Sequence, residues 1–143
     1  MGIYSLSQRT TATAAASASW EVRSTSTNKP KLMEIGISQV AATAGVYGIG
    51  RPAAIGVTPT SPQTFLDESD GNAPVGLTTS AVAWGTGPTV PTNHLRRVAC
   101  PATIGAGAIF TFPRGLGLPI SSSIVVWIIA TAPVCDVWAV AEE

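Results

Sequence analysis

The residues of this chain that could do catalytic chemistry are few and scattered. His94 is the only histidine, and it stands directly before Leu95, Arg96 and Arg97. The two arginines disfavour its protonation, and a general base needs a pKa near neutrality. The chain contains no Gly-x-Ser-x-Gly sequence, and neither of its cysteines has a histidine nearby in the sequence. We therefore interpret His94 as a loop or interface residue and expect no enzyme activity.

A glycine-rich segment matches a cofactor pattern in form only. Residues 48–53 read Gly-Ile-Gly-Arg-Pro-Ala, which fits the Gly-x-Gly-x-x-Gly/Ala turn of dinucleotide-binding proteins. Such a turn must open a helix whose amide groups face the phosphates. The residues that follow have no amphipathic stretch and reach Pro59 within two turns. We therefore expect no bound cofactor.

An oxygen-rich segment is the best candidate for a metal site. Residues 67–72 read Asp-Glu-Ser-Asp-Gly-Asn and could supply several oxygen ligands to calcium. The segment lacks the alternating ligand spacing and the distal glutamate of an EF-hand loop. We interpret it as a solvated Asp-Gly turn and predict no metal.

Two cysteines, Cys100 and Cys135, can form at most one bridge, and neither belongs to a Cys-x-x-Cys pair. We interpret them as two buried free thiols that act as small apolar side chains. A single disulfide between them is the alternative.

Charge is scarce in the 143 residues. Charged residues make up 11% of the chain where about a quarter is usual, and eight lysines and arginines balance eight aspartates and glutamates. A zero net charge gives no field that attracts nucleic acid or an anionic membrane, so we expect neither as a partner. A folded monomer of this size exposes about 6,900 Å². Because so thin a cover of charge favours association, we predict a homo-oligomer.

The residues that we predict to contact partners are mainly arginines. Arginine is enriched at protein interfaces and binds acidic groups, although scattered surface charge is the alternative explanation. Trp84 precedes the flexible residues 85–88 and could lie in an interface. The candidate contacts are Tyr4, Arg9, Arg51, Trp84, Arg96, Arg97 and Arg114.

The elements that position these residues are predicted to be strands, because apolar and polar residues alternate with a period of two. The expected strands cover residues 18–23, 33–37, 46–50, 81–84, 95–99, 108–112, 116–120, 124–130 and 134–141. The last two flank Thr131-Ala132-Pro133 and are predicted to form a hairpin. Residues 18–23 are predicted to have a polar outer face, and residues 58–75 a long surface excursion.

Short strands bounded by glycine and proline indicate a single all-β domain. Eleven prolines agree, because sheet edges and turns accept proline and helix interiors do not. We predict an antiparallel sandwich, jelly roll or small barrel over residues 19–143. Residues 11–18 have no amphipathic face and are interpreted as an extended arm or a strand lead-in, and residues 1–18 as a whole are predicted to form an extended N-terminal arm.

Several segments resemble small proteins found among the virion genes of tailed bacteriophages. The likeness covers most of residues 20–143 and rests on residues 32–36, 48–56, 83–86, 112–115, 125–127 and 136–138. It implies a virion structural protein on the capsid surface, made in the host cytoplasm. The type that it resembles most is a capsid decoration (cement) protein, which is β-rich, often a homotrimer and bound to the major capsid protein.

The resemblance implies a mechanical role and transfers no catalytic residue. In this hypothesis the β body binds its own copies, while residues 2–18 and 58–75 contact neighbouring shell subunits; both segments could instead be mobile surface. Binding to the assembled shell alone would stabilise it by linkage. The alternative function is a β module on a tail or fibre that binds a receptor or carbohydrate. The sequence leaves capsid and tail locations open.

Overall fold

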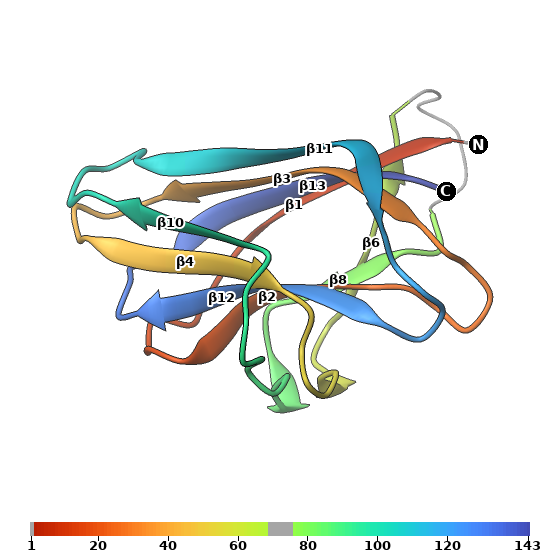
Figure 1. Ribbon diagram of the computed structural model, residues 1–143, viewed down its shortest axis with the longest axis horizontal. Coiled ribbons are helices and arrows are strands. Elements are labelled where there is room, and N and C mark those ends of the chain that lie inside the picture. Colours follow the sequence, from red (N-terminus) through yellow and green to blue (C-terminus); the bar gives the residue numbers. More distant parts are fainter. Residues whose placement is uncertain (1, 69–75) are drawn as a thin grey trace.

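The computed structural model describes residues 2–68 and 76–143, and the regular structure in this part of the chain is entirely β-strand. The antiparallel sandwich predicted from the alternating pattern is confirmed (Figure 1). The strands are β1 (Ile3–Arg9), β2 (Ser17–Arg23), β3 (Lys31–Gln39), β4 (Gly45–Gly50), β5 (Val57–Pro59), β6 (Gln63–Thr64), β7 (Leu66–Asp67), β8 (Thr79–Ala81), β9 (Trp84–Thr86), β10 (Arg96–Cys100), β11 (Gly107–Gly117), β12 (Ser123–Ala130) and β13 (Cys135–Glu142).

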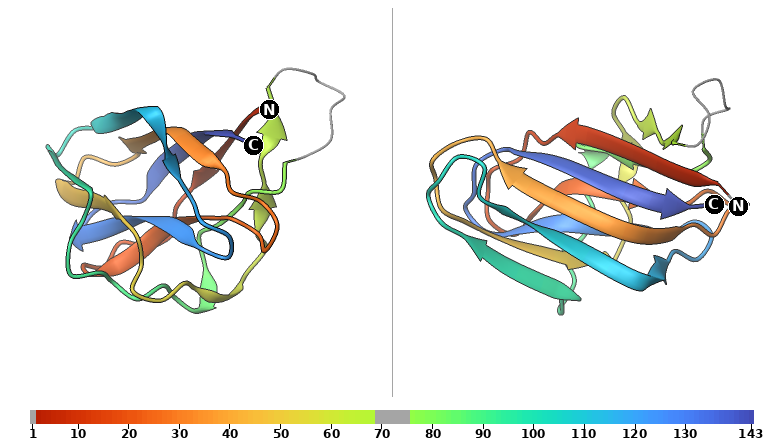
Figure 2. Two further views of the ribbon diagram at one scale, coloured as in Figure 1. Left: turned by 45° about the vertical axis from the view of Figure 1, so that its right-hand side comes forward. Right: turned by 90° about the horizontal axis from the view of Figure 1, so that it is seen from above.

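Two sheets form the sandwich. Sheet A has the strand order β11-β3-β13-β1-β7, and sheet B has the order β10-β4-β12-β2-β8-β6. Figure 2 shows β1, β13, β3 and β11 side by side when the molecule is seen from above. A separate two-stranded ribbon joins β5 to β9. No helix among the described residues is long and apolar enough to cross a membrane.

The core lies between the sheets and follows from the period of two. On β13, Val137, Ala139 and Ala141 are buried, while the residues between them are half-buried. Alternate side chains of a strand point to opposite faces, so one face of β13 fills the core and the other remains near solvent. From sheet B, Trp20 and Val126 complete the same apolar cluster.

Strand β12 is buried on both faces, which explains its continuous apolar sequence. Ile124, Val126 and Ile128 belong to the core between the sheets. Val125 and Trp127 form a second cluster on the opposite face of sheet B. Sheet B is therefore the middle layer of three.

The third layer is formed by residues 51–59 and 83–95, which we call the cover. The β5–β9 ribbon lies within it, and Ala53 donates a backbone hydrogen bond to Thr89 at 2.9 Å. The cover lies over the outer face of sheet B, where a methyl group at Gly48 would meet the His94 ring at 2.8 Å. The polar outer face predicted for residues 18–23 is present, as Ser19, Glu21 and Arg23, but the strand is not half-buried as expected, because the cover buries this face while the core buries the other.

The predicted hairpin of the last two strands is also wrong. Strand β12 pairs with β2 and β4 in sheet B, whereas β13 pairs with β1 and β3 in sheet A. The connection through Ala132 and Pro133 is buried and passes from one sheet to the other. Each of the two strands therefore has two ladder partners within its own sheet.

The predicted N-terminal arm belongs largely to the domain. Ile3–Arg9 forms β1, which pairs with β13 along its whole length and with β7 on its other side. Leu6 packs against the core, and the Gly2 amide donates a hydrogen bond to the Glu143 carbonyl at 2.9 Å. The expected strand lead-in is present, since β2 begins at Ser17.

The predicted surface excursion over residues 58–75 is partly integrated into the sheets. Strands β6 and β7 pair with β8 and β1, and Phe65 between them is fully buried. Residues 69–75 of the excursion lie outside the described part of the chain.

Candidate functional site

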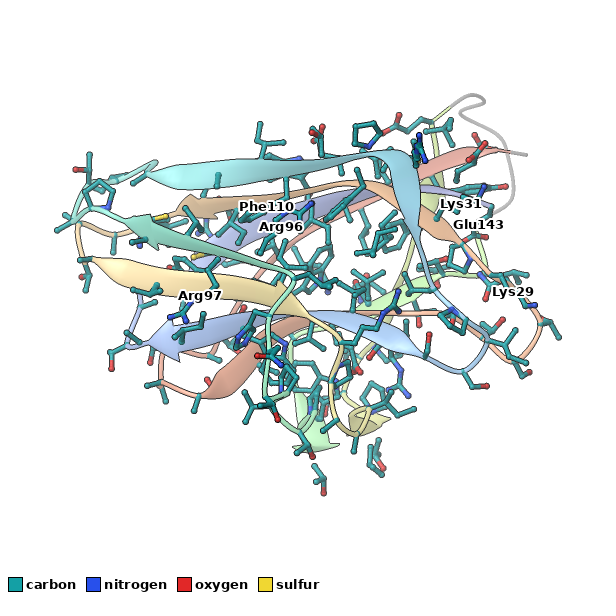
Figure 3. The ribbon with its side chains drawn as sticks, viewed as in Figure 1. Lys29, Lys31, Arg96, Arg97, Phe110 and Glu143 are labelled. Atoms are coloured by element: carbon teal, nitrogen blue, oxygen red, sulfur yellow. The ribbon has the colours of Figure 1, made fainter. Side chains whose placement is uncertain are left out.

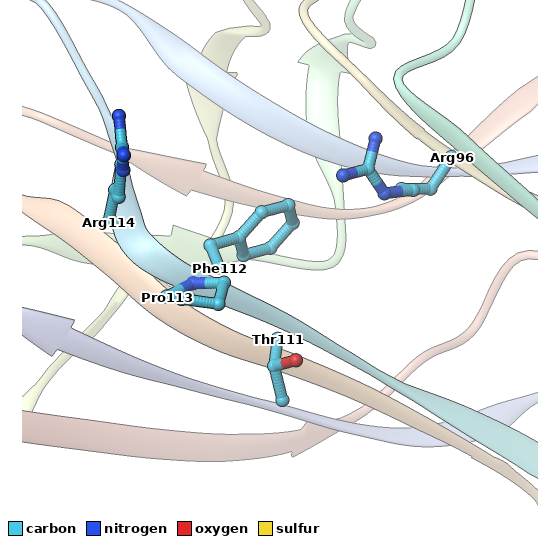
Figure 4. Close-up of a pocket in the computed structure, with 6 residues that line it drawn as sticks. Arg96, Thr111, Phe112, Pro113 and Arg114 are labelled. Atoms are coloured by element: carbon cyan, nitrogen blue, oxygen red, sulfur yellow. The ribbon is translucent and has the colours of Figure 1, made fainter.

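A shallow groove opens where the β11 edge of sheet A faces the β10 edge of sheet B (Figure 4). Its volume is about 360 Å³, and Thr111, Phe112 and Pro113 form its floor. Arg96 and Arg114 stand at its two sides, with the Phe112 ring between them. The Arg96 guanidinium lies 5.9 Å from the centre of that ring, at cation–π distance.

A bulge in β11 produces the groove. The pairing of β11 with β3 shifts register between Thr111 and Leu116, so residues 112–115 leave the ladder. Pro113 has no amide hydrogen to donate to a ladder, and Gly115 has a φ of +71°, which favours glycine. The bulge turns Phe112 into the gap between the sheets and leaves Arg114 exposed.

A second hollow continues the groove along the same edge. It has a volume of about 370 Å³ and is lined by Lys29 and Lys31, together with residues 117–119. Arg51 reaches this hollow, since its Nη2 donates a hydrogen bond to the Gly117 carbonyl at 2.7 Å. Figure 3 shows Lys29 and Lys31 near each other at one end of the sandwich.

Five cations therefore lie along one side of the molecule, from the middle of the sandwich to its end (Figure 3), and we call this set the cationic edge. All five side chains belong to exposed residues, and none forms an ion pair with any residue in the described part of the chain. The cationic edge consists of Lys29, Lys31, Arg51, Arg96 and Arg114.

Three of the seven predicted contact residues are brought together here, namely Arg51, Arg96 and Arg114. Arg97 alternates with Arg96 along β10 and pairs with Gly48, which places it on the outer face of sheet B beside the cover. Arg97 is exposed there and disfavours protonation of a nearby histidine, as described below.

The other three predicted contacts make internal interactions. Tyr4 is half-buried and packs against the core. Arg9 forms a two-pronged ion pair with Asp136, with Nε–Oδ1 and Nη2–Oδ2 distances of 2.8 and 3.0 Å. The hydrogen bond from Arg9 and its positive charge hold the pKa of Asp136 below its usual value. Trp84 donates its indole N–H to Glu21 at 2.7 Å.

Glu21 is a buried carboxylate that sequence reasoning missed. Its residue is completely inaccessible to solvent. Oε1 accepts hydrogen bonds from Ser123 Oγ at 2.7 Å and from the Gly56 amide at 3.1 Å, and Oε2 lies 3.7 Å from Arg23 Nη1. Together with Trp84, these partners fix the cover to sheet B. Gly56, Trp84 and Ser123 come from three segments far from Glu21 in the sequence, so no local sequence pattern could have revealed the cluster.

His94 lies on the same face and belongs to the loop before β10, as predicted. Its ring meets the edge of Trp127 with centroids 6.5 Å apart, and Nε2 is buried without a hydrogen-bond partner in the described structure. Burial, and secondarily the charge of Arg97, lower the pKa of His94. The neutral ring therefore serves as a packing element over sheet B.

Both cysteines are buried free thiols, as predicted. Cys135 donates a hydrogen bond to Tyr47 Oη at 2.9 Å, and Tyr47 in turn donates to the Pro133 carbonyl at 3.2 Å. Burial raises the pKa of Cys100, Cys135 and Tyr47, which keeps these groups protonated and unreactive near neutrality.

The two motifs considered for ligands have different outcomes. The glycine-rich pattern lies on β4 and continues into the cover without a helix, which agrees with its rejection as a cofactor turn. Residues 69–72 of the oxygen-rich segment lie outside the described residues. Within residues 2–68 and 76–143, no three potential metal ligands of the His, Cys, Asp or Glu type cluster together.

Lys29 and Lys31 are the members of the cationic edge that sequence reasoning missed. They form no run of positive charge, because Pro30 separates them. The signal that could have revealed them is the pairing of Lys31 with Gly117, which requires the register of β3 and β11.

No family model, curated protein or solved structure matches the chain.

Proposed function

We propose that this protein is a structural component of a tailed-bacteriophage virion, a capsid decoration protein that binds acidic protein surfaces through its cationic edge. The observation on which the proposal depends is that five exposed cations lie along this edge and that none of them forms an ion pair with a residue of 2–68 or 76–143. In a chain with only eight lysines and arginines, this concentration leaves the positive charge available to a partner.

The chemistry of the edge suits a carboxylate-bearing protein segment. Arginine offers a planar fork of donors that matches a carboxylate, and Arg96 and Arg114 stand on either side of an apolar floor. Phe112 and Pro113 in that floor give a partner's main chain and small side chains a surface to cover. The groove is open and elongated, which fits a protein surface better than an enclosed small molecule.

The bare outer face of sheet A offers additional contact area next to this edge. Its middle contains half-buried Trp138, and its margins expose Ile109 and Leu66, which retain 60% and 56% of their accessible surface. No cover comparable to that of sheet B lies over it in the described structure. A partner seated on the edge can extend across this face, and binding only to the assembled shell would stabilise the shell.

The test uses virus particles prepared without this protein, to which the purified chain is added back. The variant Arg51→Glu/Arg96→Glu/Arg114→Glu should lose binding by about tenfold or more, because each charge reversal places like charges at the contact. Arg97→Glu is the control, since it reverses an exposed cation on the outer face of sheet B, away from the cationic edge and from sheet A. Cosedimentation measures binding, and averaged electron micrographs show where the density lies.

Equal binding of the triple variant and the wild type would contradict the proposal. Density at a fibre tip instead of the shell would support the alternative of a receptor- or carbohydrate-binding tail module.

A further inference from the structure

The edge of sheet A opposite the cationic edge carries negative charge. Sheet A ends on this side with β7, which includes Asp67 and is followed by exposed Glu68. The Glu68 amide donates a hydrogen bond to the Ile3 carbonyl at 2.8 Å, which fixes this residue beside β1. We call Asp67 and Glu68 the acidic edge.

The two edges lie at the same level along the strands. Gly117 at the cationic edge pairs with Lys31, which pairs with Glu142, which in turn pairs with Ile3. Glu68 continues this row through its bond to Ile3. The row crosses all five strands of sheet A, so a second copy placed beside the first at the same height brings its Glu68 next to Gly117.

The cations lie where this junction would form. Arg51 is hydrogen-bonded to Gly117 itself, and Arg114 belongs to the bulge just before it on β11. A carboxylate delivered to this place meets two guanidinium groups, which is favourable for a charge-assisted contact.

The apolar side chains at the two edges fit the same arrangement. Leu66 pairs with Ser5 and Ile109 pairs with Gly36, and both side chains project from the outer face of sheet A. Successive cross-strand pairs lead from Leu66 through Val140 to Thr111 on β11. Ile109 is two residues from Thr111, so it lies almost level with Leu66 along the strands. Copies placed edge to edge would therefore bring two of the most exposed aliphatic side chains of the protein close together.

We propose that the acidic edge of one copy binds the cationic edge of the next, so that copies associate head to tail. The proposal rests on the proposed function, because it names a second copy as an occupant of the cationic edge. The two surfaces in contact are different, so this association is heterologous and produces either a closed ring or an open filament. A symmetric contact of two cationic edges would place like charges together and is disfavoured.

Sedimentation velocity over a concentration series at low salt tests the proposal. The wild type should associate, and raising the salt concentration should weaken the association. Arg51→Glu/Arg114→Glu and, separately, Glu68→Lys should each weaken it by about tenfold or more. Arg9→Gln and Asp136→Asn are the controls, because this pair lies at the end of β1 opposite to Ile3 and Glu68.

Mixing the two edge variants gives the sharpest result. The double arginine variant keeps its acidic edge, and Glu68→Lys keeps its cationic edge. An equimolar mixture should therefore associate through the intact acidic edge of one variant and the intact cationic edge of the other, while each variant alone associates about tenfold more weakly or less. Circular dichroism of each variant verifies that it is folded.

Self-association that both edge variants retain would overturn the head-to-tail contact. If the triple variant that reverses the cationic edge then also loses particle binding, the proposed function stands and only this inference fails. If the triple variant keeps both self-association and particle binding, both proposals are wrong.

Discussion

The two outer faces of the sandwich contain the same hydrogen bond in opposite surroundings. On sheet B, the Trp84 indole donates to Glu21 at 2.7 Å beneath the cover. On sheet A, the Trp138 indole donates to Glu34 at 2.8 Å on a face that no other segment of the described structure covers. Glu21 is fully buried, whereas Glu34 keeps contact with water.

This difference teaches that the partner network of a carboxylate reflects its access to water. A buried charge is tolerated only when paired and hydrogen-bonded, so Glu21 has three donors and a nearby arginine. Glu34 needs no such set because water solvates it. The Glu21 cluster is therefore part of the fold, whereas the open face of sheet A is free for partners.

The largest effect should come from removing the two carboxylates in turn. Glu21→Ala leaves three buried donors without their acceptor and removes the charge partner of Arg23, so we expect the free energy of unfolding to fall by about 3–5 kcal/mol. Glu34→Ala should cost less than about 1 kcal/mol, because water replaces the lost acceptor. Urea denaturation of both variants measures this. Equal losses would contradict the distinction between the faces.

A smaller effect should follow from removing the indole donors. Trp84→Phe keeps an aromatic ring over sheet B but leaves Glu21 Oε2 without its closest partner, which should cost about 1–3 kcal/mol. Trp138→Phe should cost less than about 1 kcal/mol on the open face. Hydrogen exchange should show faster exchange in β5 and β9 for Trp84→Phe only. Unchanged exchange in that ribbon would mean that Trp84 does not fasten the cover.

The smallest effects are the pH dependences of the two faces. Because the pKa of His94 is lowered in the folded state, the unfolded chain binds the proton first, and stability should decrease as the pH falls below 6.5. The pKa of Asp136 is lowered by Arg9, so its contribution is present above pH 3.8 and is lost as the pH falls further. Denaturation of His94→Gln and Asp136→Asn across this range separates the two. If the difference in free energy of unfolding between the wild type and His94→Gln does not change with pH around pH 6, the assignment to His94 is wrong.

The sequence predicted the fold class well, because alternation of side chains is a local property. Strands β3 and β4 appear at the expected places, since Ile35, Ile37 and Ile49 point into one core. Which strands a given strand pairs with depends on segments far away in the sequence. The run from Ile124 to Ala130 has the same composition whether it forms a hairpin or the middle of another sheet, so its pairing could not be predicted.

The candidate site was predicted in part for the same reason. Arg51, Arg96 and Arg114 were selected one by one because arginine suits interfaces, but their proximity depends on the bulge in β11 and on the gap between the sheets. The role of Trp84 was open from the sequence, because only the cover places its indole beside Glu21. Local chemistry thus selected residues, and long-range pairing decided which of them act together.

The pairing of β1 with β13 determines when the molecule can be completed. Ile3 lies opposite Glu142, so strands from the two extremes of the described chain meet within sheet A. Contacts between residues so far apart in sequence slow folding, because a long loop must close first. During synthesis on the ribosome, β1 lacks the strand with which it pairs until β13 emerges. We therefore expect sheet A to be completed only after β13 has left the ribosome.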